Sequence, residues 1–313
     1  MPFEVTILGS SSATPTSTRH PSAQVVNILG RFFLIDCGEG TQMQLRKYKF
    51  KLQKIKFICI SHLHGDHYLG LIGLISTMTL LNRKSELLIF APNGIEEIIK
   101  LHLKLSHSII NFPLKVISLK KTGLTKIFED KSINLFSFPL KHRVPCWGFK
   151  LVEKKRKKNI LKSAIKKFNI PINQFNSIKC GSDFVDEKNN IIKNDMITID
   201  SPEPRSYAYC SDTVYYEKII DYVSDVDLLY HEATFHSDLQ KRAKQTYHST
   251  TRDAAKIAKN ASVDKLIIGH FSSRYKDLDI LKEDALKFFR NTDLALEGSK
   301  WNINKKNKNE NNS

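Results

Sequence analysis

The stretch HLHGDH, at residues 62–67, places three histidines and an aspartate within six positions. Imidazole and carboxylate groups are the ligands that zinc and similar metals take in proteins. His62 and His64 are two positions apart, so an extended loop can direct both side chains to the same side. Asp66 and His67 follow a glycine, which permits a sharp reversal. The stretch is therefore typical either of a polar surface loop or of part of a two-metal site. Four ligands are too few for two ions, so a two-metal site needs further ligands from elsewhere in the chain.

Three more potential ligands each follow an apolar run that predicts a strand. His142 comes after LFSFPLK, Asp212 after YAYCS and His270 after KLIIG. Any one of them is as typical of a capping or turn residue as of a metal ligand. Because all of these residues share the position after a strand, we expect them to meet in one metal centre. Its candidate ligands are His62, His64, Asp66, His67, His142, Asp212 and His270.

The elements that must position these residues alternate along the chain. Strand patterns occur at 3–9, 24–38, 55–61, 87–92, 114–119, 133–142, 206–212, 226–233 and 263–270. Helical patterns occur at 68–81, 95–105, 251–260 and 279–291. Strands interspersed with helices favour an α/β architecture with sheets in the middle and helices outside. Strand ends then aim polar side chains into a common crevice from rigid elements.

Length and composition bound the class of protein. The 313 residues are 41% hydrophobic, which suffices for one large domain or two modest ones. The net charge of +17 favours a polyanionic partner, but Lys, Ile and Asn are frequent throughout, so only local clusters carry weight. The densest basic segments are KKRKK at 154–158 and KSAIKK at 162–167. A solvated charge run is the usual role of such segments.

Cysteine usage and hydropathy favour a cytoplasmic protein without a membrane partner. The five cysteines are widely spaced and form no CxxC, which is typical of reduced, buried thiols. The N-terminal MPFEVTILGS alternates like a strand and has none of the regions of a signal peptide. The longest apolar run, at 68–81, is shorter than the roughly 20 residues that cross a bilayer.

The motif HxHGDH, followed by the isolated His142, Asp212 and His270, resembles the metallo-β-lactamase superfamily. Four further segments resemble ribonuclease Z, the family of tRNA 3′-processing endonucleases. They are LGSSSATPTSTRHPSA near the start, LIDCGEGTQMQL, HEATF at 231–235 with YHST at 247–250, and GHFSSRY at 269–275. The resemblance covers roughly the first 275 residues. It implies an αββα sandwich with a protruding basic arm.

This resemblance divides the chain into three parts. Residues 1–300 are expected to form the catalytic domain, with the arm inserted at about 150–178. The polar tail at 301–313 is expected to be disordered. Arms of this family often contain a glycine- and proline-rich turn, which this chain lacks. The resemblance therefore carries less weight for the geometry of the arm than for the catalytic domain.

The resemblance also implies a role for each site residue. His62, His64 and His142 go to one zinc ion, Asp66, His67 and His270 go to a second, and Asp212 bridges them. Each subunit would then hold two Zn²⁺, with Mn²⁺ as the alternative. Asp66 lies on the metal loop and is the expected proton acceptor from water. Independently of the resemblance, Asp36 is more typical of a turn-forming residue, or of one that orients a metal-bound histidine, than of a ligand.

His248 is the expected proton donor to the departing 3′-oxygen, oriented by Glu232 of the HEAT sequence. Histidine is the side chain best poised to give a proton near neutral pH, although the resemblance carries most of this assignment. The alternative is that Glu232 or Ser249 merely caps local structure.

The resemblance implies that the enzyme cuts precursor tRNA, leaving a tRNA 3′-hydroxyl and a 5′-phosphorylated trailer. In the family the arm grips the tRNA elbow, commonly from the other subunit of a homodimer. Basic side chains on phosphates give salt-sensitive binding that is largely independent of sequence. The candidate substrate-binding residues are Lys154, Lys155, Arg156, Lys157 and Lys158.

Two other functions stay open. One is a different two-metal hydrolase on the same scaffold, acting on a lactone, thioester, sulfate ester or small phosphodiester. The sequences HEAT and HST and the basic insertion argue against it. The other is a non-catalytic RNA-binding relative, against which the complete ligand set argues. Whether precursors with or without an encoded CCA are preferred is not decided by the loop around Arg19.

Overall fold

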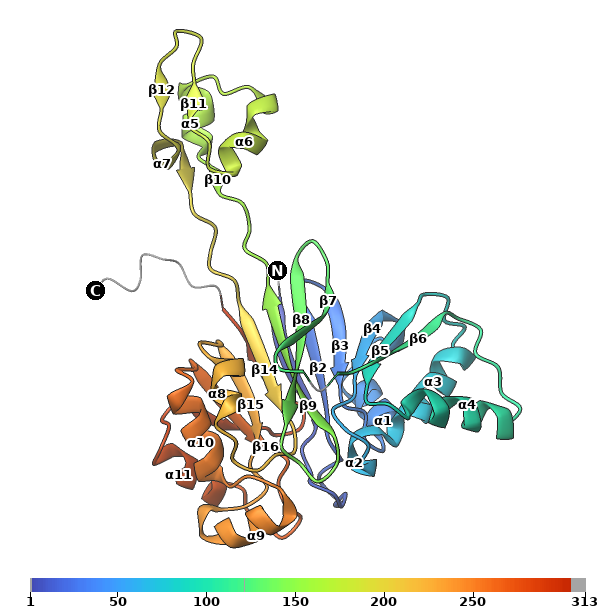
Figure 1. Ribbon diagram of the computed structural model, residues 1–313. Helices are drawn as coiled ribbons and strands as arrows, with labels where there is room; N and C mark the ends of the chain where they lie inside the picture. The colour runs from blue at the N-terminus through green and yellow to red at the C-terminus, as the bar shows by residue number, and fades with distance from the viewer. Residues whose placement is uncertain (1, 121, 305–313) are drawn as a thin grey trace. The chain divides into compact units, whose positions relative to one another are not determined.

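The computed structural model describes residues 2–120 and 122–304, which fall into two compact units (Figure 1). Among these residues, the first unit holds the chain up to Glu129, Asn134–Leu151 and Ser206–Ile303. The second unit holds Asp130–Ile133 and Val152–Arg205. No helix in the described part of the chain is long and apolar enough to cross a membrane.

Two seven-stranded sheets form the centre of the first unit. The first sheet has the order β18 (Lys300–Asn302), β1 (Phe3–Gly9), β2 (Ala23–Ile28), β3 (Arg31–Ile35), β4 (Ile55–Cys59), β5 (Leu87–Ala91) and β6 (Leu114–Ser118). The second has the order β17 (Thr292–Leu294), β16 (Lys265–Gly269), β15 (Leu228–Glu232), β14 (Ser206–Cys210), β9 (Cys146–Glu153), β8 (Ile133–Leu140) and β7 (Thr125–Glu129). In both sheets the strands that precede the site, β3–β6 and β14–β17, are parallel.

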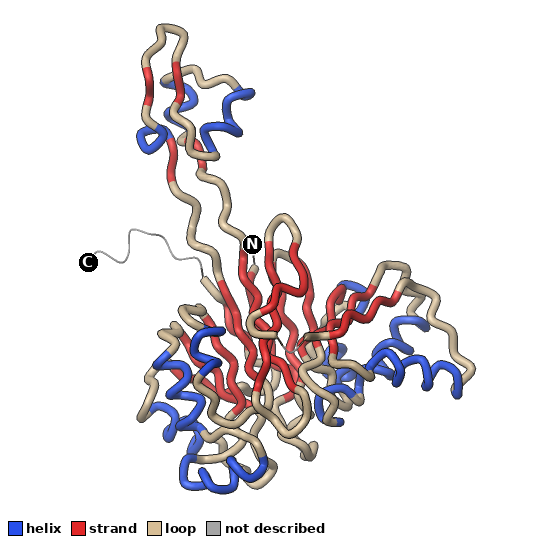
Figure 2. Tube along the Cα trace, in the orientation of Figure 1, coloured by secondary structure: helices blue, strands red, loops and turns tan. Residues whose placement is uncertain are grey.

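Helices cover the outer face of each sheet (Figures 1 and 2). On the first sheet lie α1 (Thr41–Lys47), η1 (Leu52–Lys54), α2 (Gly65–Tyr68), α3 (Gly70–Leu80) and α4 (Ile95–Leu105). On the second sheet lie α8 (Lys218–Val223), α10 (Thr251–Asn260) and α11 (Asp279–Leu286). The chain reaches α10 through η3 (Ser237–Leu239) and α9 (Gln240–Thr246). The inner faces meet where Phe57 of β4 contacts Phe128 of β7, with ring centroids 4.7 Å apart. The order helix, sheet, sheet, helix confirms the predicted αββα sandwich.

Local sequence explains the elements that hold the site. All five residues of β14, SYAYC, are buried, as expected for a parallel strand covered on both faces. The α10 helix begins with a capping box in which Thr250 and Asp253 exchange hydrogen bonds. Its alanines and Ile257 then pack against the second sheet. Burial of these faces fixes the strand ends from which the polar residues emerge.

Two predicted elements are divided in the structure. The strand predicted at 24–38 is a hairpin, because Leu29 and Gly30 both take positive φ angles, of 54° and 82°. Two adjacent positive φ angles are the conformation of a two-residue hairpin turn. The helix predicted at 68–81 is α2 followed by α3. The α3 helix begins at Gly70. This position requires glycine, because a Cβ atom there would lie 2.1 Å from the carbonyl oxygen of Gly38.

The second unit has a small core of its own. It consists of β10 (Asn159–Ile160), α5 (Lys162–Lys167), η2 (Ile172–Gln174), α6 (Phe175–Lys179), β11 (Phe184–Val185), β12 (Ile191–Ile192), α7 (Asn194–Ile197) and β13 (Thr198–Ile199). Its buried residues are Ala164, Ile170, Ile178, Phe184, Ile192 and Ile197. Of the segment predicted as the arm, 150–178, residues 152–178 belong to this unit, which continues to Arg205. Of the tail predicted to be disordered, residues 301 and 302 belong to β18, and 305–313 lie outside the described residues.

Candidate metal centre

Four of the predicted metal ligands lie just beyond the end of a strand in the first unit. His62 follows β4, His142 follows β8, Asp212 follows β14 and His270 follows β16. Since β14, β15 and β16 are parallel and in register, their carboxyl ends meet at one edge of the second sheet. The short α2 helix carries Asp66 and His67. Two sheets and one helix therefore bring all seven residues together.

Four of these residues form a first ligand group. The Nδ1 atom of His64 lies 3.1 Å from Nε2 of His62 and 3.2 Å from Nε2 of His142. Oδ2 of Asp212 lies 3.5 Å from His62 Nε2 and 3.8 Å from His142 Nε2. Ligands around a tetrahedral zinc with Zn–N bonds near 2.0–2.1 Å are separated by about 3.3 Å. The four atoms thus have the spacing of a single metal site.

The other three predicted ligands form a second group, which also uses Asp212. Oδ2 of Asp66 lies 3.4 Å from His67 Nε2 and 3.3 Å from His270 Nε2. Oδ1 of Asp212 lies 3.5 Å from His67 Nε2 and 3.3 Å from His270 Nε2. The two oxygens of Asp212 therefore face different groups, as a bridging carboxylate requires.

Unsatisfied polar atoms mark the same place. Among the described residues, Nε2 of His67 and Oδ1 of Asp212 are buried and have no hydrogen-bond partner. Leaving a buried polar atom unpaired costs about 1–3 kcal/mol, so such atoms call for a ligand. Both atoms belong to the second group, and a cation between them would satisfy both. The residues present therefore fit divalent metal ions.

Outer contacts hold the imidazoles in position. Nδ1 of His67 lies 2.7 Å from Oδ2 of Asp36, which also accepts a hydrogen bond from Tyr209. Asp36 is thus placed to orient His67, a histidine of the predicted metal loop. Nδ1 of His142 donates to the carbonyl oxygen of Tyr247 at 2.8 Å, and Nδ1 of His270 lies 3.0 Å from the hydroxyl of Thr234. Each of these contacts leaves Nε2 directed at the centre.

At His62 and Asp212 the surroundings favour the protonation states that a metal needs. Burial lowers the pKa of His62 well below its ordinary value, and repulsion from His67 lowers it further. Burial opposes the charged form of Asp212, but attraction to the protonated forms of His270 and His67 outweighs it, so the pKa of Asp212 lies well below its ordinary value. A neutral imidazole and an ionised carboxylate are both ready to bind a cation.

Glu232 and His248 form a pair beside the first group. Oε1 of Glu232 lies 3.0 Å from Nδ1 of His248, which in turn lies 3.9 Å from Oδ2 of Asp212. Glu232 is fully buried. Burial lowers the pKa of His248, but the carboxylates of Glu232 and Asp212 outweigh it and raise that pKa to about 9. His248 is therefore held in the protonated form near neutral pH.

Glu232 is also tied to the loops around it. Its Oε1 accepts hydrogen bonds from the backbone N–H groups of Thr213 and Ser249, and its Oε2 accepts two from Thr234. A carboxylate with this many donors stays ionised. Ser249 does not cap α10, because Thr250 is the N-cap residue and the Ser249 hydroxyl donates to the Thr213 carbonyl. Glu232 thus organises local structure as well as facing His248.

Several contacts of the centre were not foreseen from the sequence. The backbone N–H of Ala13 donates to Oδ2 of Asp66 at 2.8 Å, across 53 positions of the chain. The guanidinium of Arg274 lies over the ring of Phe235, 5.0 Å from its centroid, and Phe235 in turn contacts His248. Both Phe235 and Arg274 belong to segments that carry the resemblance, which was the one available signal for them.

The predicted substrate-binding cations lie in the second unit, in the extended segment before β10. Three of them have partners there: Arg156 with Glu153 at 3.4 Å, Lys157 with Asn176 at 2.6 Å, and Lys158 with Asp200 at 3.6 Å. Lys155 is exposed. Part of the positive charge of this segment is thus offset within the unit.

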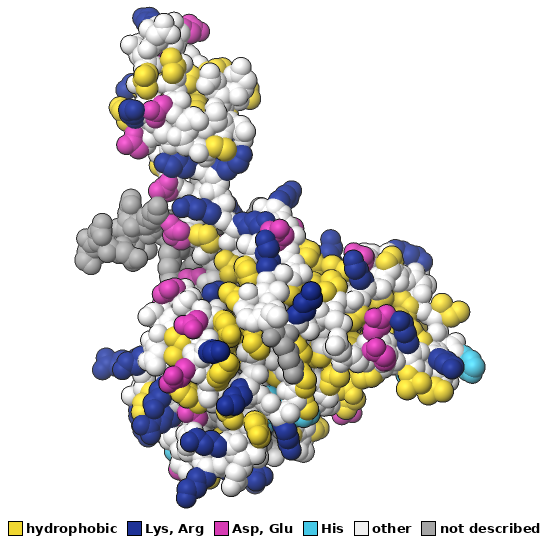
Figure 3. All heavy atoms as spheres, in the orientation of Figure 1, with side chains coloured by type: hydrophobic (Ala, Val, Ile, Leu, Met, Phe, Trp, Pro, Cys, Tyr) yellow, Lys and Arg dark blue, Asp and Glu magenta, His cyan; other side chains and the backbone are white. Residues whose placement is uncertain are grey.

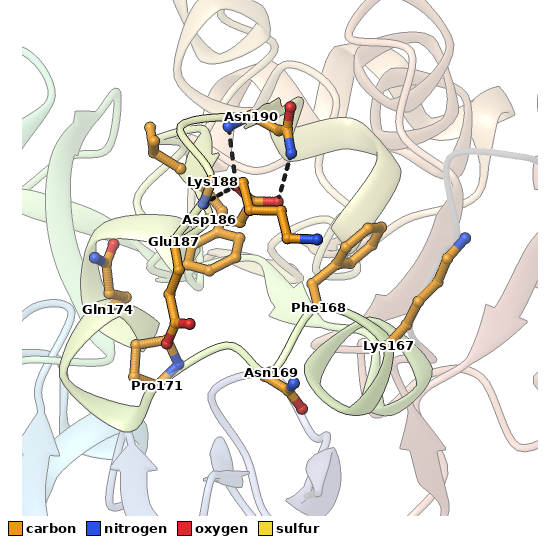
Figure 4. A pocket seen from close by; sticks show the side chains of 11 residues that line it. Lys167, Phe168, Asn169, Pro171, Gln174, Asp186, Glu187, Lys188 and Asn190 are labelled. Carbon is orange, nitrogen blue, oxygen red and sulfur yellow. Dashed lines mark hydrogen bonds between the residues drawn. The ribbon is translucent and has the colours of Figure 1, made fainter.

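The second unit also contains a cavity of about 570 Å³ (Figure 4). Phe168, Lys167 and Lys188 line it together with polar residues of the β11–β12 turn. Asp186 is held in that turn by hydrogen bonds from Asn190 and from the backbone of Lys188, drawn as dashed lines in Figure 4. The lining also includes the carboxylates of Asp186 and Glu187, so the charges of its two lysines are matched by two negative charges.

Comparison with known proteins gives consistent results. A ribonuclease Z from Bacteroides fragilis is 45% identical over 295 residues, which cover 94% of this chain and 97% of that protein. The crystal structure of human tRNase Z, short form, has a TM-score of 0.72 and 28% identity, and covers 96% of this chain and 99% of its own. A metallo-beta-lactamase fold protein from Bacillus subtilis, 18% identical, shares the fold with a TM-score of 0.69 and covers 96% and 100% of the two chains. The family model Anti-Pycsar protein Apyc1 matches residues 3–156.

Proposed function

The chain belongs to the ribonuclease Z family, and from this premise we propose that it removes 3′ trailers from precursor tRNA by hydrolysis at a centre of two divalent metal ions. The observation that carries this proposal is the orientation of the Asp212 carboxylate. Its two oxygens face separate groups of imidazoles. Two adjacent ligand groups with a shared carboxylate suit phosphodiester hydrolysis. The ions are proposed to be Zn²⁺, with Mn²⁺ as the alternative.

When bound, the ions supply charge that stabilises the transition state of the scissile phosphate and activates the attacking water. Asp66 is the proposed acceptor of the proton from that water, and the hydrogen bond from Ala13 holds its Oδ2 in place. His248 is the proposed donor of a proton to the departing 3′-oxygen. Glu232 keeps His248 oriented and protonated. The phosphorus–O3′ bond breaks, so the phosphate stays on the 5′ end of the trailer.

The second unit is the proposed tRNA-binding arm. Its exposed Lys155 and the cations near it, Lys154, Arg156, Lys157 and Lys158, would contact tRNA phosphates. Recognition through phosphates and shape suits a substrate whose body is an RNA helix. The cytoplasmic location expected from the sequence stays a prediction.

A homodimer is also proposed, because apolar side chains are exposed on the first unit. Leu101 and Leu105 lie one helical turn apart on α4 and are 57% and 71% exposed, and Ile109, a few residues beyond, is 83% exposed. Figure 3 shows apolar atoms on the surface over this helix. Exposed apolar surface of this kind marks protein interfaces. Leu101→Lys with Leu105→Lys should convert a dimer to a monomer in light scattering, and a wild-type chain already monomeric at high concentration would refute the proposal.

Cleavage of a 3′-extended precursor tRNA by the purified protein with Zn²⁺ or Mn²⁺ tests the function. The rival hydrolases on the same scaffold predict a different result. Turnover of a lactone, thioester or sulfate ester without any RNA cleavage would overturn the assignment, and RNA binding without cleavage would favour a non-catalytic relative.

A further inference from the structure

A second cavity, of about 770 Å³, adjoins the metal centre in the first unit. Its apolar walls are Leu63, Pro92, Leu119, Val144, Pro145 and Trp147. None of the roles assigned above uses these residues. The walls come from four separate segments, and they surround a space larger than a single nucleobase.

The cavity begins next to the ligands of the first group. Leu63 stands between His62 and His64 in the sequence, and consecutive Cα atoms are about 3.8 Å apart. Trp147 is tied to the same segment, because its backbone N–H donates to the carbonyl oxygen of Ser61 at 3.0 Å. The cavity therefore borders the loop that carries His62 and His64.

The wall of the cavity is rigid at Trp147. Trp147 is 3% exposed, and its indole N–H donates to the carbonyl oxygen of Lys120 at 3.0 Å, which fixes the ring in the wall. Leu119 is also buried, whereas Pro145 is exposed at the entrance. Polar contacts are few: Asn93, Ser118 and Lys120. A rigid, mostly apolar slot with few polar groups accepts a flat ring and does not read its edges closely.

The side of the centre identifies which nucleotide this ring belongs to. The scissile phosphate joins two nucleosides, one through the departing 3′-oxygen and one through a 5′-oxygen. The departing oxygen lies by His248, and no residue lining the cavity comes from the segments that carry Glu232 and His248. With the nucleoside on the tRNA side beside His248, the cavity is open to the first trailer nucleotide. Lys120 at the rim would face the next trailer phosphate.

We propose that the cavity between Leu63 and Trp147 binds the base of the first trailer nucleotide, whatever its identity. This inference rests on the proposed function, and it adds a binding site on the trailer side of the cut. Base binding positions the scissile phosphate, so removal of the base should lower kcat/KM for cleavage. Replacement of one base by another should have a smaller effect.

Two precursor tRNAs that differ only at the first trailer position test the proposal, one with uridine and one with an abasic nucleotide. The wild-type enzyme should cleave the uridine substrate about tenfold more efficiently, within the range that base–aromatic and apolar contacts supply. Val144→Trp fills the cavity and should reduce this ratio to about one. Ile280→Trp adds the same side chain on the exposed surface of α11 and should keep the wild-type ratio.

Equal cleavage of the two substrates by the wild-type enzyme would overturn the inference, whatever the variants do. A Val144→Trp enzyme that keeps a tenfold ratio would also overturn it. If the wild-type enzyme cleaves neither substrate, the proposed function itself fails, which is a different outcome. A variant that does not fold leaves the wild-type comparison decisive.

Discussion

The carboxylate of Glu232 lies 3.0 Å from Nδ1 of His248, and both its oxygens are occupied by donors. The pair therefore has one geometry, in which His248 is protonated and adjacent to Asp212. This arrangement suits a proton donor that acts beside a metal centre without being a ligand.

Removal of His248 should impair chemistry and spare metal binding. General acid catalysis contributes about 10²–10⁴-fold, so His248→Ala should lower kcat for precursor cleavage by that factor. The variant should retain its full metal content. His102→Ala, on the α4 helix outside the centre, is the matched control and should keep wild-type kcat. Loss of metal in His248→Ala would show that this residue is a ligand.

The activity should fall at alkaline pH. His248 must carry its proton to donate it, so kcat should decrease as pH rises through the pKa of this group. The carboxylates raise that pKa to about 9, and bound cations would lower it, so the descending limb of the pH profile should lie at or below pH 9. Glu232→Gln removes the attraction that raises the pKa. The descending limb should then move to lower pH. An unchanged dependence of kcat on pH would show that His248 is not the proton donor.

The number of bound metal ions should respond differently to two substitutions. His64 belongs only to the first group, so His64→Ala should leave about one ion per chain. Asp212 faces both groups, so Asp212→Ala should weaken both sites and lower the content further. Elemental analysis after dialysis measures this directly. Identical metal content in the two variants would contradict the bridging role.

Neutralising arm cations should change binding and its salt dependence. Each lost phosphate contact reduces the slope of log affinity against log salt by roughly one. Lys155→Gln with Lys157→Gln should therefore raise KM for precursor tRNA and flatten the salt slope by about two, with kcat little changed. Lys100→Gln with Lys126→Gln removes two exposed cations of the first unit and serves as the control. If log affinity depends on log salt as steeply in the arm variant as in the wild-type protein, other residues contact the phosphates.

Much of the centre could be predicted because its signals are local. HLHGDH is six residues long, and His142, Asp212 and His270 each follow an apolar run that forms a strand. Strand ends are easy to locate from such runs, and parallel strands bring their carboxyl ends to one edge. The αββα sandwich was predicted from the alternation of strand and helix patterns along the sequence, together with the resemblance.

Contacts between distant segments could not be predicted in this way. The hydrogen bond from Ala13 to Asp66 and that from His142 to the carbonyl of Tyr247 involve backbone atoms, which carry no signature in the sequence. The hairpin turn at Leu29–Gly30 was missed because leucine seldom adopts a positive φ angle. The end of the second unit was missed because its few buried residues, such as Ile192 and Ile197, lie in elements of two to four residues. Elements that short give no periodic pattern.

The central claim is hydrolysis of precursor tRNA with a departing 3′-oxygen, and the chemistry of the two product ends tests it most directly. The protein should be incubated with Zn²⁺ and a 3′-extended precursor, and both ends at the cut should be mapped. We expect a 3′-hydroxyl on the tRNA and a 5′-phosphate on the trailer. A tRNA product that ends in a 2′,3′-cyclic phosphate, or an intact precursor, would contradict the account.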